Sequence, residues 1–225
     1  MRLLKHITIH GVIACVSGLR IGGSKDDIEI GGMENPIIRH PISGLPYIPG
    51  SSLKGRMRAL LELKYSSDTQ QTGEPCGCGK ESCQVCIVFG PHKNVRHNLG
   101  PTRIIVRDAN LTRNSEKVLT KAQEEKGIYF AEVKTENWVN RKTGVAGNQG
   151  LRTQERIPAG TKFDFEIVLR IFDGDIEKKM VDFVLDGLSM VQKEYLGGSG
   201  SRGYGKVIFS DLFIDEEPLT LVGEK

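Results

Sequence analysis

The sequence predicts an α+β fold in which an antiparallel sheet carries two helices on one face. Two segments, 3–17 and 163–171, place apolar residues at every second position, as strands with one buried face do. Two other segments, 51–65 and 176–195, repeat apolar residues at spacings of three and four, which is typical of helices packed on a core.

The first half of the chain alternates between regular elements and loops. The strand over 3–17 is followed by a loop over 18–32, because Gly and Asp interrupt every apolar pattern there. The helix over 51–65 comes next. A short strand is then expected over 102–108, where the sequence TRIIVRD is rich in β-branched residues.

The second half contains a charged helix over 115–126, a strand over 127–139 and a polar, Gly-containing excursion over 140–151. The strand over 163–171 and the helix over 176–195 follow, and a final strand over 207–213 completes the sheet. The resulting order, strand, helix, strand, strand, helix, strand, is that of a ferredoxin-like or split βαβ fold with long insertions.

No strong linker and no internal repeat divides the chain, so we expect one domain over 1–225, with insertions at about 68–100 and 134–152. The hydrophobic content of 38% and a mean hydropathy of -0.27 are ordinary for a soluble protein. No apolar run approaches the roughly 20 residues of a membrane-spanning helix. The first residues lack the apolar block of a signal peptide, so a cytoplasmic protein with no membrane partner is expected.

Four of the five cysteines form a compact C-x-C-x4-C-x2-C motif, made of Cys76, Cys78, Cys83 and Cys86. Soft thiolates at this spacing are typical of a tetrahedral zinc site, and four protein ligands leave no open position for a reacting water. The zinc is therefore expected to be structural. His92 could replace one cysteine as a ligand, and the fifth cysteine, Cys15, is expected in the core.

Glycine accounts for 27 of the 225 residues, and many of the glycines flank cations. The Gly-rich loop, 197–206, matches G-x-G-x-x-G, but a helix precedes it and a strand follows, which excludes the dinucleotide fold. Its exposed amides, cations and ring suit a phosphate backbone or a stacked base. The residues expected to contact a polyanion in this loop are Gly198, Ser199, Gly200, Arg202 and Tyr204.

Two other segments combine glycine or a helix start with basic residues. Arg20 lies in GLRIGG, and Ser51 and Ser52 cap the start of a helix that carries Lys54 and Arg58 one turn apart. A third stretch, 134–156, is also basic. The net charge is only +3, so these segments indicate either a local polyanion groove on an otherwise balanced chain or a set of solvated charged faces; the combination of glycine and cations in three segments favours the groove.

The segments GLRIGG, NPIIRHPISGLPYIPGSSLKGRMR, KTENWVNRKTGVA, ERIPAGTKFDFEI and YLGGSGSRGYGKV occur in this order. Together they resemble the backbone RAMP-superfamily subunits of type III-A CRISPR–Cas (Csm) effector complexes. The resemblance covers nearly the whole chain. It implies a modified RNA-recognition-motif core, a helical filament of several copies, and partners that include CRISPR RNA, target RNA and other subunits of the complex.

By this resemblance, Arg20, Ser51, Ser52, Lys54, Arg58 and the Gly-rich loop would hold the guide backbone. Segment 134–152 would be a thumb β-hairpin that folds over the guide–target duplex, with RNA contacts from Lys134, Asn137 and Arg141. Trp138, Val139 and Val145 could add apolar contacts there, although Trp138 could equally pack within the hairpin.

The resemblance also implies metal-dependent cleavage of target RNA, with magnesium or manganese, that leaves a 2′,3′-cyclic phosphate. The family's catalytic carboxylate is an Asp, and the matching residue here is Glu34. Glu keeps the charge but adds a methylene, and a misplacement of about 1 Å can cost about a hundredfold in rate. Residual cleavage by Glu34 is expected, and Asp26, Asp27 and Glu29 are substitute candidates.

Two alternatives remain open on the sequence. The chain could be a purely structural guide-binding subunit, because Glu replaces the family's Asp. It could also be a stand-alone endonuclease of precursor guide RNA, although its five histidines form no evident catalytic group and such enzymes usually contain two domains.

Overall fold

The computed structural model describes residues 1–23, 35–127, 129–147 and 150–221. Its centre is a sheet in the order β2-β6-β1-β7-β8, with every pairing antiparallel. These strands are Ile104–Val106 (β2), Lys162–Phe172 (β6), Leu3–Cys15 (β1), Val207–Ile214 (β7) and Glu217–Leu219 (β8). The order of the first four strands is that of the ferredoxin-like fold, which confirms the predicted fold class.

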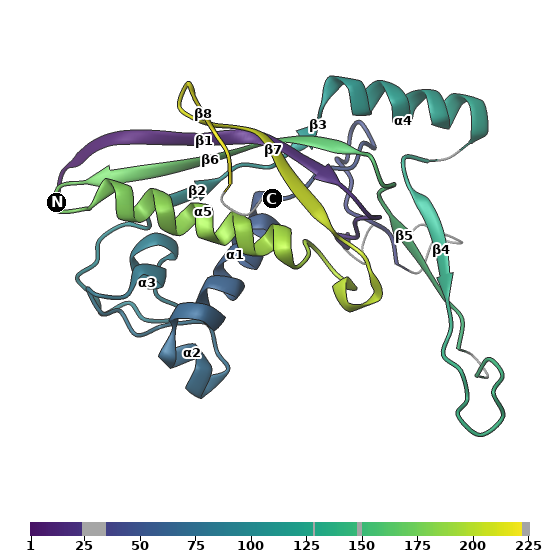
Figure 1. Cartoon of the computed structure of the whole chain (residues 1–225), viewed down its shortest axis with the longest axis horizontal. Helices are drawn as coiled ribbons and strands as arrows, with labels where there is room; N and C mark the ends of the chain where they lie inside the picture. Colours follow the sequence, from purple (N-terminus) through teal and green to yellow (C-terminus); the bar gives the residue numbers. More distant parts are fainter. Residues whose placement is uncertain (24–34, 128, 148–149, 222–225) are drawn as a thin grey trace.

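Helices α1 (Gly50–Tyr65) and α5 (Glu177–Lys193) cover the same face of the sheet (Figure 1). They approach closely at Gly187, where a Cβ atom would lie 2.9 Å from Leu61 Cδ1. The expected serine caps of the first helix are wrong. The side chains of Ser51 and Ser52 make no capping bond, and the amide of Gly50 instead donates to Asp108 Oδ1 at 2.7 Å.

The core lies between the sheet and these two helices. Alternate residues of β1 and β6 face it, and the register places Ile9 beside Ile167. On β7, Phe209 meets Phe165 edge to face, with ring centroids 5.4 Å apart. The alternation of apolar residues along these strands therefore corresponds to the one face of the sheet that is buried.

A long segment between α1 and β2 contains helices α2 (Ser67–Thr72) and α3 (Gln84–Phe89), which the sequence patterns do not predict. Helix α3 is short, and Cys83 occupies its N-cap position without a side-chain capping bond. Its side chains Val85, Val88 and Phe89 are buried in the core, so the cysteine segment is attached to the domain by apolar packing.

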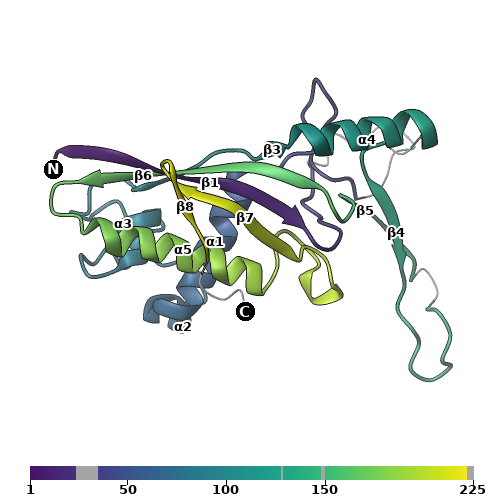
Figure 2. The same ribbon diagram turned by 45° about the horizontal axis from the view of Figure 1, so that its top comes forward.

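A second insertion forms a hairpin that projects from the body of the molecule (Figures 1 and 2). Its base is a two-stranded antiparallel sheet of β4 (Glu132–Glu136) and β5 (Arg152–Arg156). The strand expected over 127–139 is thus shorter and does not join the central sheet. β5 is absent from the sequence expectation because its sequence, RTQER, has no apolar residue to alternate.

The helix over Arg113–Lys126 (α4) lies beside the base of the hairpin and is capped by Thr112, whose side chain accepts from the amide of Ser115. The two-residue strand β3 (Asn110–Leu111) precedes it and pairs with β6. In the described part of the chain, no helix has both the length and the apolar character needed to cross a membrane.

Candidate nucleic-acid interface and metal centre

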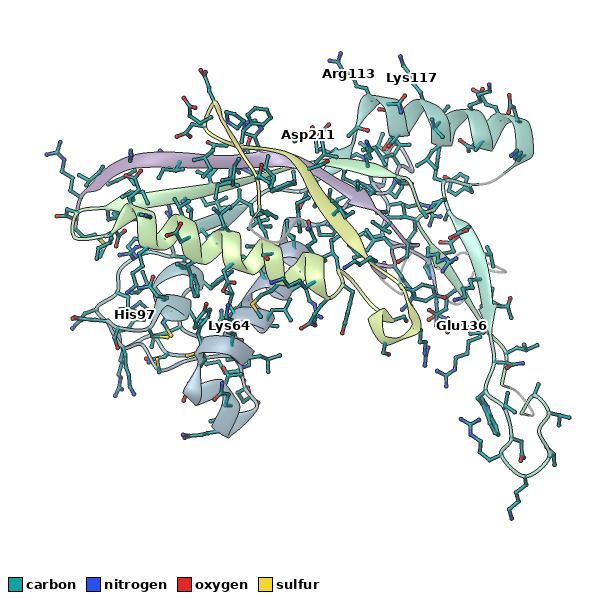
Figure 3. The ribbon with its side chains drawn as sticks, viewed as in Figure 1. Lys64, His97, Arg113, Lys117, Glu136 and Asp211 are labelled. Carbon is teal, nitrogen blue, oxygen red and sulfur yellow. The ribbon has the colours of Figure 1, made fainter. Side chains whose placement is uncertain are left out.

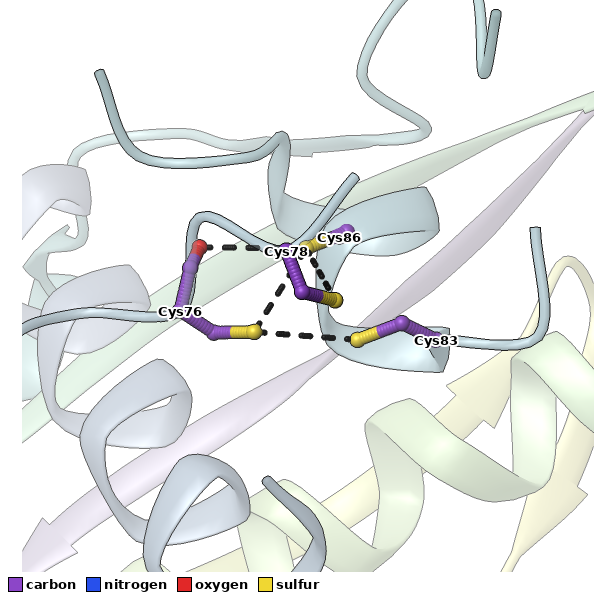
Figure 4. A group of neighbouring side chains, drawn as sticks. All are labelled: Cys76, Cys78, Cys83 and Cys86. Carbon is purple, nitrogen blue, oxygen red and sulfur yellow. Dashed lines mark hydrogen bonds between the residues drawn. The ribbon is translucent and has the colours of Figure 1, made fainter. Parts of the chain in front are cut away.

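The four clustered cysteines converge on one point (Figure 4). The Sγ atom of Cys76 lies 3.8 Å from that of Cys83 and 3.6 Å from that of Cys86, and Cys78 Sγ lies 3.7 Å from Cys86 Sγ. With Zn–S bonds of about 2.3 Å, the edge of a tetrahedral site is about 3.8 Å. The four sulfur atoms therefore have the spacing of ligands to one metal ion such as zinc.

The sequence candidate His92 is not part of this group. All four ligand atoms within 4.8 Å of one another are cysteine sulfurs, and the His92 ring faces Glu74, with Nε2 3.9 Å from its carboxylate. His92 contributes through its backbone, since its amide donates to Cys76 O at 2.9 Å. The expectation that His92 could replace a cysteine is wrong.

Burial affects the thiols of this cluster. It raises the pKa of Cys83 to about 11 and also raises the pKa of Cys86. Without a cation these two groups would be neutral thiols at pH 7, whereas a bound dication favours the thiolate form that coordinates it. For Cys78, burial acts in the same direction, but hydrogen bonds from the backbone of Lys80 and from the neighbouring cysteines outweigh it and lower the pKa of that thiol. It is the convergence of the four sulfur atoms that suits the cluster to hold a metal.

A buried carboxylate connects the cysteine segment to α1. Glu62 Oε1 accepts both the Cys76 amide, at 2.9 Å, and Arg58 Nε, at 2.7 Å, while Arg58 Nη2 donates to Cys76 O at 3.0 Å. The Arg58 side chain is only 18% exposed. The sequence assigns Arg58 to a polyanion, but the structure shows its guanidinium bonded to the cysteine segment.

Lys54 lies one turn earlier on α1, and its surroundings differ from those of Arg58. It is partly buried, and among the described residues it has no acidic partner. Burial, followed by the neighbouring Arg58 and Arg170, lowers the pKa of Lys54. Lys54 is therefore an uncompensated cation, with Ser51 exposed near it at the start of the helix and Ser52 half-buried.

The Gly-rich loop is fixed in place by backbone hydrogen bonds rather than being flexible. The amide of Gly198 donates to Arg20 O at 2.8 Å, and the amide of Gly205 donates to Gly18 O at 3.0 Å. A Cβ atom at Gly197 would lie 2.3 Å from Arg20 O, and the residue has a φ of +76°, so only glycine fits. These contacts bring the Arg20 segment and the loop together.

Within the loop, Gly200–Arg202 forms a 3-10 turn between two left-handed residues, Ser199 and Gly203. Ser199 Oγ lies 3.5 Å from Gln154 Oε1 on β5. A Cβ atom at Gly200 would lie 2.1 Å from the ring of Tyr195, which in turn stacks under the Arg56 guanidinium at 3.9 Å. The loop therefore lies between α1 and the base of the hairpin.

Tyr204 is buried at the centre of this junction, with 1% of its surface exposed. Lys134 Nζ and Arg156 Cζ lie 4.6 Å and 4.9 Å from its ring centroid. Burial, with the carboxylate of Glu136 nearby, raises the pKa of the hydroxyl. The expectation that this ring contacts RNA is wrong in this structure, because Tyr204 has no exposed face for a base and instead supports the two cations.

Two acids that the sequence reasoning missed lie at the base of the hairpin. Glu136 lies 3.4 Å from Lys134 Nζ and 3.2 Å from Arg202 Nη1, so it joins β4 to the Gly-rich loop (Figure 3). Glu132 pairs with Arg156 at 2.6 Å. The contacts of Glu136 with Arg202 and of Glu132 with Arg156 join residues 66 and 24 positions apart, so no local sequence signal could have identified them.

Asn35 holds a further segment against the hairpin. Its Oδ1 accepts from Arg20 Nη2 at 3.4 Å, and its Nδ2 donates to Thr153 O at 3.3 Å. Nearby, Arg39 makes a two-pronged ion pair with Glu155 on β5, at 2.8 Å and 3.2 Å. The sequence candidates Glu34, Asp26, Asp27 and Glu29 lie outside the described residues.

The far end of the hairpin is shaped by a turn in which Asn140 Oδ1 accepts the amides of Lys142 and Thr143. Trp138 packs against Gly147, where a Cβ atom would lie 2.2 Å from the indole, yet it remains 49% exposed. The ring therefore packs within the hairpin in part, and its contact with RNA stays a prediction. The other exposed side chains of the far end are Asn137, Val139, Arg141, Lys142 and Val145.

The site as a whole therefore brings together Arg20, the Gly-rich loop and the two cations of the hairpin base, Lys134 and Arg156. Arg58 is instead bonded to the cysteine segment. Clustered cations can bind phosphate, and the projecting hairpin supplies a half-exposed aromatic ring.

Comparisons with known proteins show which family the chain resembles. The model of the RAMP superfamily matches residues 12–208. The chain is 47% identical to the CRISPR system Cms endoribonuclease Csm3 of Methanothermobacter thermautotrophicus, over 97% of this chain and 89% of that protein. It is 41% identical to the protein of the same name from Methanocaldococcus jannaschii, over 92% of this chain and 79% of the relative.

A solved structure is also similar. It is a chain from the crystal structure of the Csm3-Csm4 subcomplex in the type III-A CRISPR-Cas interference complex. The TM-score is 0.59 at 31% sequence identity, and the match covers 94% of this chain and 79% of that chain.

Proposed function

The chain belongs to the RAMP superfamily, and because the relatives it matches are Csm3 proteins, we propose that it is a backbone subunit of a type III-A CRISPR effector complex. In this role it binds CRISPR RNA, assembles with copies of itself and with other subunits, and cleaves complementary target RNA in the cytoplasm. One observation carries the RNA-binding part: Arg20, Lys134, Arg156 and Arg202 meet around an ordered Gly-rich loop at the foot of a projecting hairpin.

This arrangement suits recognition of a backbone rather than of bases. The loop is held rigidly by its own backbone hydrogen bonds, and the cations come from three separate parts of the chain. A subunit that accepts any guide sequence must contact phosphate and sugar, because base pairing with the guide already supplies specificity. Lys54, with Ser51 and Ser52 at the start of α1, would add a further contact to the backbone.

We propose that the hairpin lies against the guide–target duplex. Its far end presents Arg141 and Lys142 as exposed cations, together with the half-exposed ring of Trp138. Cations of this kind bind phosphates, and an aromatic face can stack on a base that has left the duplex. Asn137, which is exposed and precedes Trp138 in the sequence, would add a polar contact.

The cleavage step follows the chemistry expected of the family. The 2′-oxygen of the target attacks the adjacent phosphorus, the bond from phosphorus to the 5′-oxygen breaks, and the products are a 2′,3′-cyclic phosphate and a 5′-hydroxyl. Magnesium or manganese would stabilise the negative charge that develops on the phosphate. We assign the carboxylate function to Glu34, whose neighbour in sequence, Asn35, is held between Arg20 and Thr153.

We further propose that the four cysteines hold one structural zinc ion. All four positions of a tetrahedral site are filled by Cys76, Cys78, Cys83 and Cys86, which leaves none for a substrate. The ion would fix the segment that packs on the core through α3.

The test uses the complex assembled with guide RNA and a labelled complementary target. With magnesium or manganese we expect cleavage at regular intervals, and Glu34→Ala should abolish it while leaving guide binding intact. Asp26→Ala and Asp27→Ala serve as matched controls on neighbouring acids and should retain cleavage. If the wild type binds target but makes no product, the chain is a structural subunit only.

A parallel incubation of the lone chain with precursor repeat RNA tests the remaining alternative. Specific cleavage there would identify a processing endonuclease instead of a filament subunit. We expect no cleavage in that reaction.

A further inference from the structure

Two of the cations assigned to RNA are already paired with an acid of the same chain. Glu136 Oε1 lies 3.4 Å from Lys134 Nζ, and Glu136 Oε2 lies 3.2 Å from Arg202 Nη1. The carboxylate joins a residue of the hairpin to a residue of the Gly-rich loop. The two cations therefore share one negative charge.

The exposure of the three side chains shows how this pairing faces solvent. The Glu136 side chain is 15% exposed, whereas Lys134 is 38% and Arg202 is 48% exposed. A phosphate can thus approach both cations from the outside while Glu136 stays beneath them. Burial opposes ionisation, but the Tyr204 hydroxyl, Lys134 and Arg202 together hold the pKa of Glu136 below its usual range, so the group is charged at neutral pH.

The other cations nearby do not share this carboxylate. Arg156 pairs with Glu132 at 2.6 Å, and Arg20 donates to the neutral side chain of Asn35. Glu136 is therefore placed to act on Lys134 and Arg202 in particular.

We propose that Glu136 is an internal counter-ion that competes with RNA phosphate for Lys134 and Arg202 and so limits the affinity of the chain for single-stranded RNA. This inference rests on the proposed RNA-binding function. Its physical basis is that a phosphate bound to the two cations is also repelled by the carboxylate beneath them. Strands that meet the whole site would still bind, whereas a strand that touches only this pair of cations would be held weakly.

The test measures RNA affinity of the full-length chain. A labelled oligouridylate is titrated with wild type and with Glu136→Gln, by fluorescence anisotropy at several potassium chloride concentrations. Glu136→Gln removes one charge repulsion that acts over a few ångströms in a medium of high dielectric constant. We therefore expect RNA binding to tighten about three- to tenfold at low salt. One more effective cation should also steepen the slope of log K against log salt by about 0.7.

The matched control is Glu124→Gln on α4. Glu124 is exposed and has no ion-pair partner among residues that the structure describes, and the substitution changes net charge by the same amount. We expect less than a twofold change in affinity for this variant. Thermal unfolding of each variant establishes that all of them are folded.

A double variant identifies the cations involved. In an Arg202→Gln background, Glu136→Gln should give a clearly smaller gain than in wild type. An undiminished gain in that background, or a Glu136→Gln affinity no tighter than that of the Glu124→Gln control, would overturn the inference. If the wild type itself fails to bind the oligonucleotide, the proposed RNA-binding function fails instead, so the two failures are distinct.

Discussion

Substituting Cys83 by serine isolates the contribution of the metal from that of the side chain. Cys83 is the N-terminal cap of α3 and its side chain makes no capping bond, whereas serine is among the preferred residues at that position. Cys83→Ser therefore keeps the size and favours the local helix, while it removes one of four metal ligands. Any loss of stability is then attributable to the missing ligand.

The size of the loss follows from what the cysteine segment holds in place. Helix α3 buries Val85, Val88 and Phe89, each at most 4% exposed. At about 1.5–3 kcal/mol per buried side chain, complete release of α3 would cost about 5–9 kcal/mol. This is an upper bound because a released segment stays partly collapsed, so we expect a loss of about 3–5 kcal/mol. For a chain of this size that corresponds to a fall in Tm of about 6–20 °C.

The assay combines elemental analysis with thermal unfolding. Wild type purified in the presence of zinc should contain one zinc per chain, and Cys83→Ser should contain much less and unfold at the lower temperature. The control is Cys15→Ala, which removes a buried thiol of β1 outside the metal cluster. It should keep its zinc and lose about 1 kcal/mol, as small core truncations do.

Two results would refute this reasoning. One is a wild-type chain that contains no zinc and whose Tm does not change with a chelator. The other is a Cys83→Ser variant that keeps a full equivalent of zinc.

Three further predictions concern the interface. Tyr204→Phe should change RNA affinity by no more than about twofold, because the buried ring supports cations rather than stacking on a base. Tyr204→Ala should lower the free energy of unfolding, measured with denaturant, by about 3–5 kcal/mol. A large loss of RNA affinity in Tyr204→Phe would contradict this role. Lys54→Gln should weaken RNA binding and reduce the salt slope by about 0.7, since Lys54 has no acidic partner among the described residues, and an unchanged slope would remove it from the interface. The pKa of Glu136 is lowered on folding, so its contribution to stability is present above its unfolded pKa and is lost as the pH falls through the lower folded value. When the stability of the two proteins is measured against pH, Glu136→Gln should therefore lose less stability in acid than wild type. Identical pH profiles for the two proteins would argue against this contribution.

Local patterns predicted the central fold well. The alternation of Phe163, Phe165 and Ile167 identified β6, and the apolar stripe of 176–195 identified α5, because both elements bury one face against a common core. The polar strand β5 was missed because pairing with β4, rather than burial of apolar residues, holds it in place. The caps of α1 were assigned to its own serines because the true acceptor, Asp108, lies 58 residues further along the chain.

The candidate site, like the fold, has features that local sequence predicted and features that depend on tertiary contacts. The cysteine spacing predicted the metal cluster, since four ligands within eleven residues of chain must lie close together whatever the rest of the fold does. The Gly-rich loop and its cations were also visible as a local motif. Their partners were not, and the sequence assigned Arg58 and Tyr204 to RNA although one is bonded to the cysteine segment and the other is buried.

The sequence by itself therefore determined the fold class, the cluster of four cysteines and the segments that carry basic residues, because periodicity and short spacing act through neighbours in the chain. Only the tertiary structure decided which of those cations are free. Lys54 is unpaired within the described chain, whereas Lys134 and Arg202 share Glu136, and Arg156 is held by Glu132. The physical reason is that the strength of an ionic contact depends on distance and burial, and both are set by segments that meet only after folding.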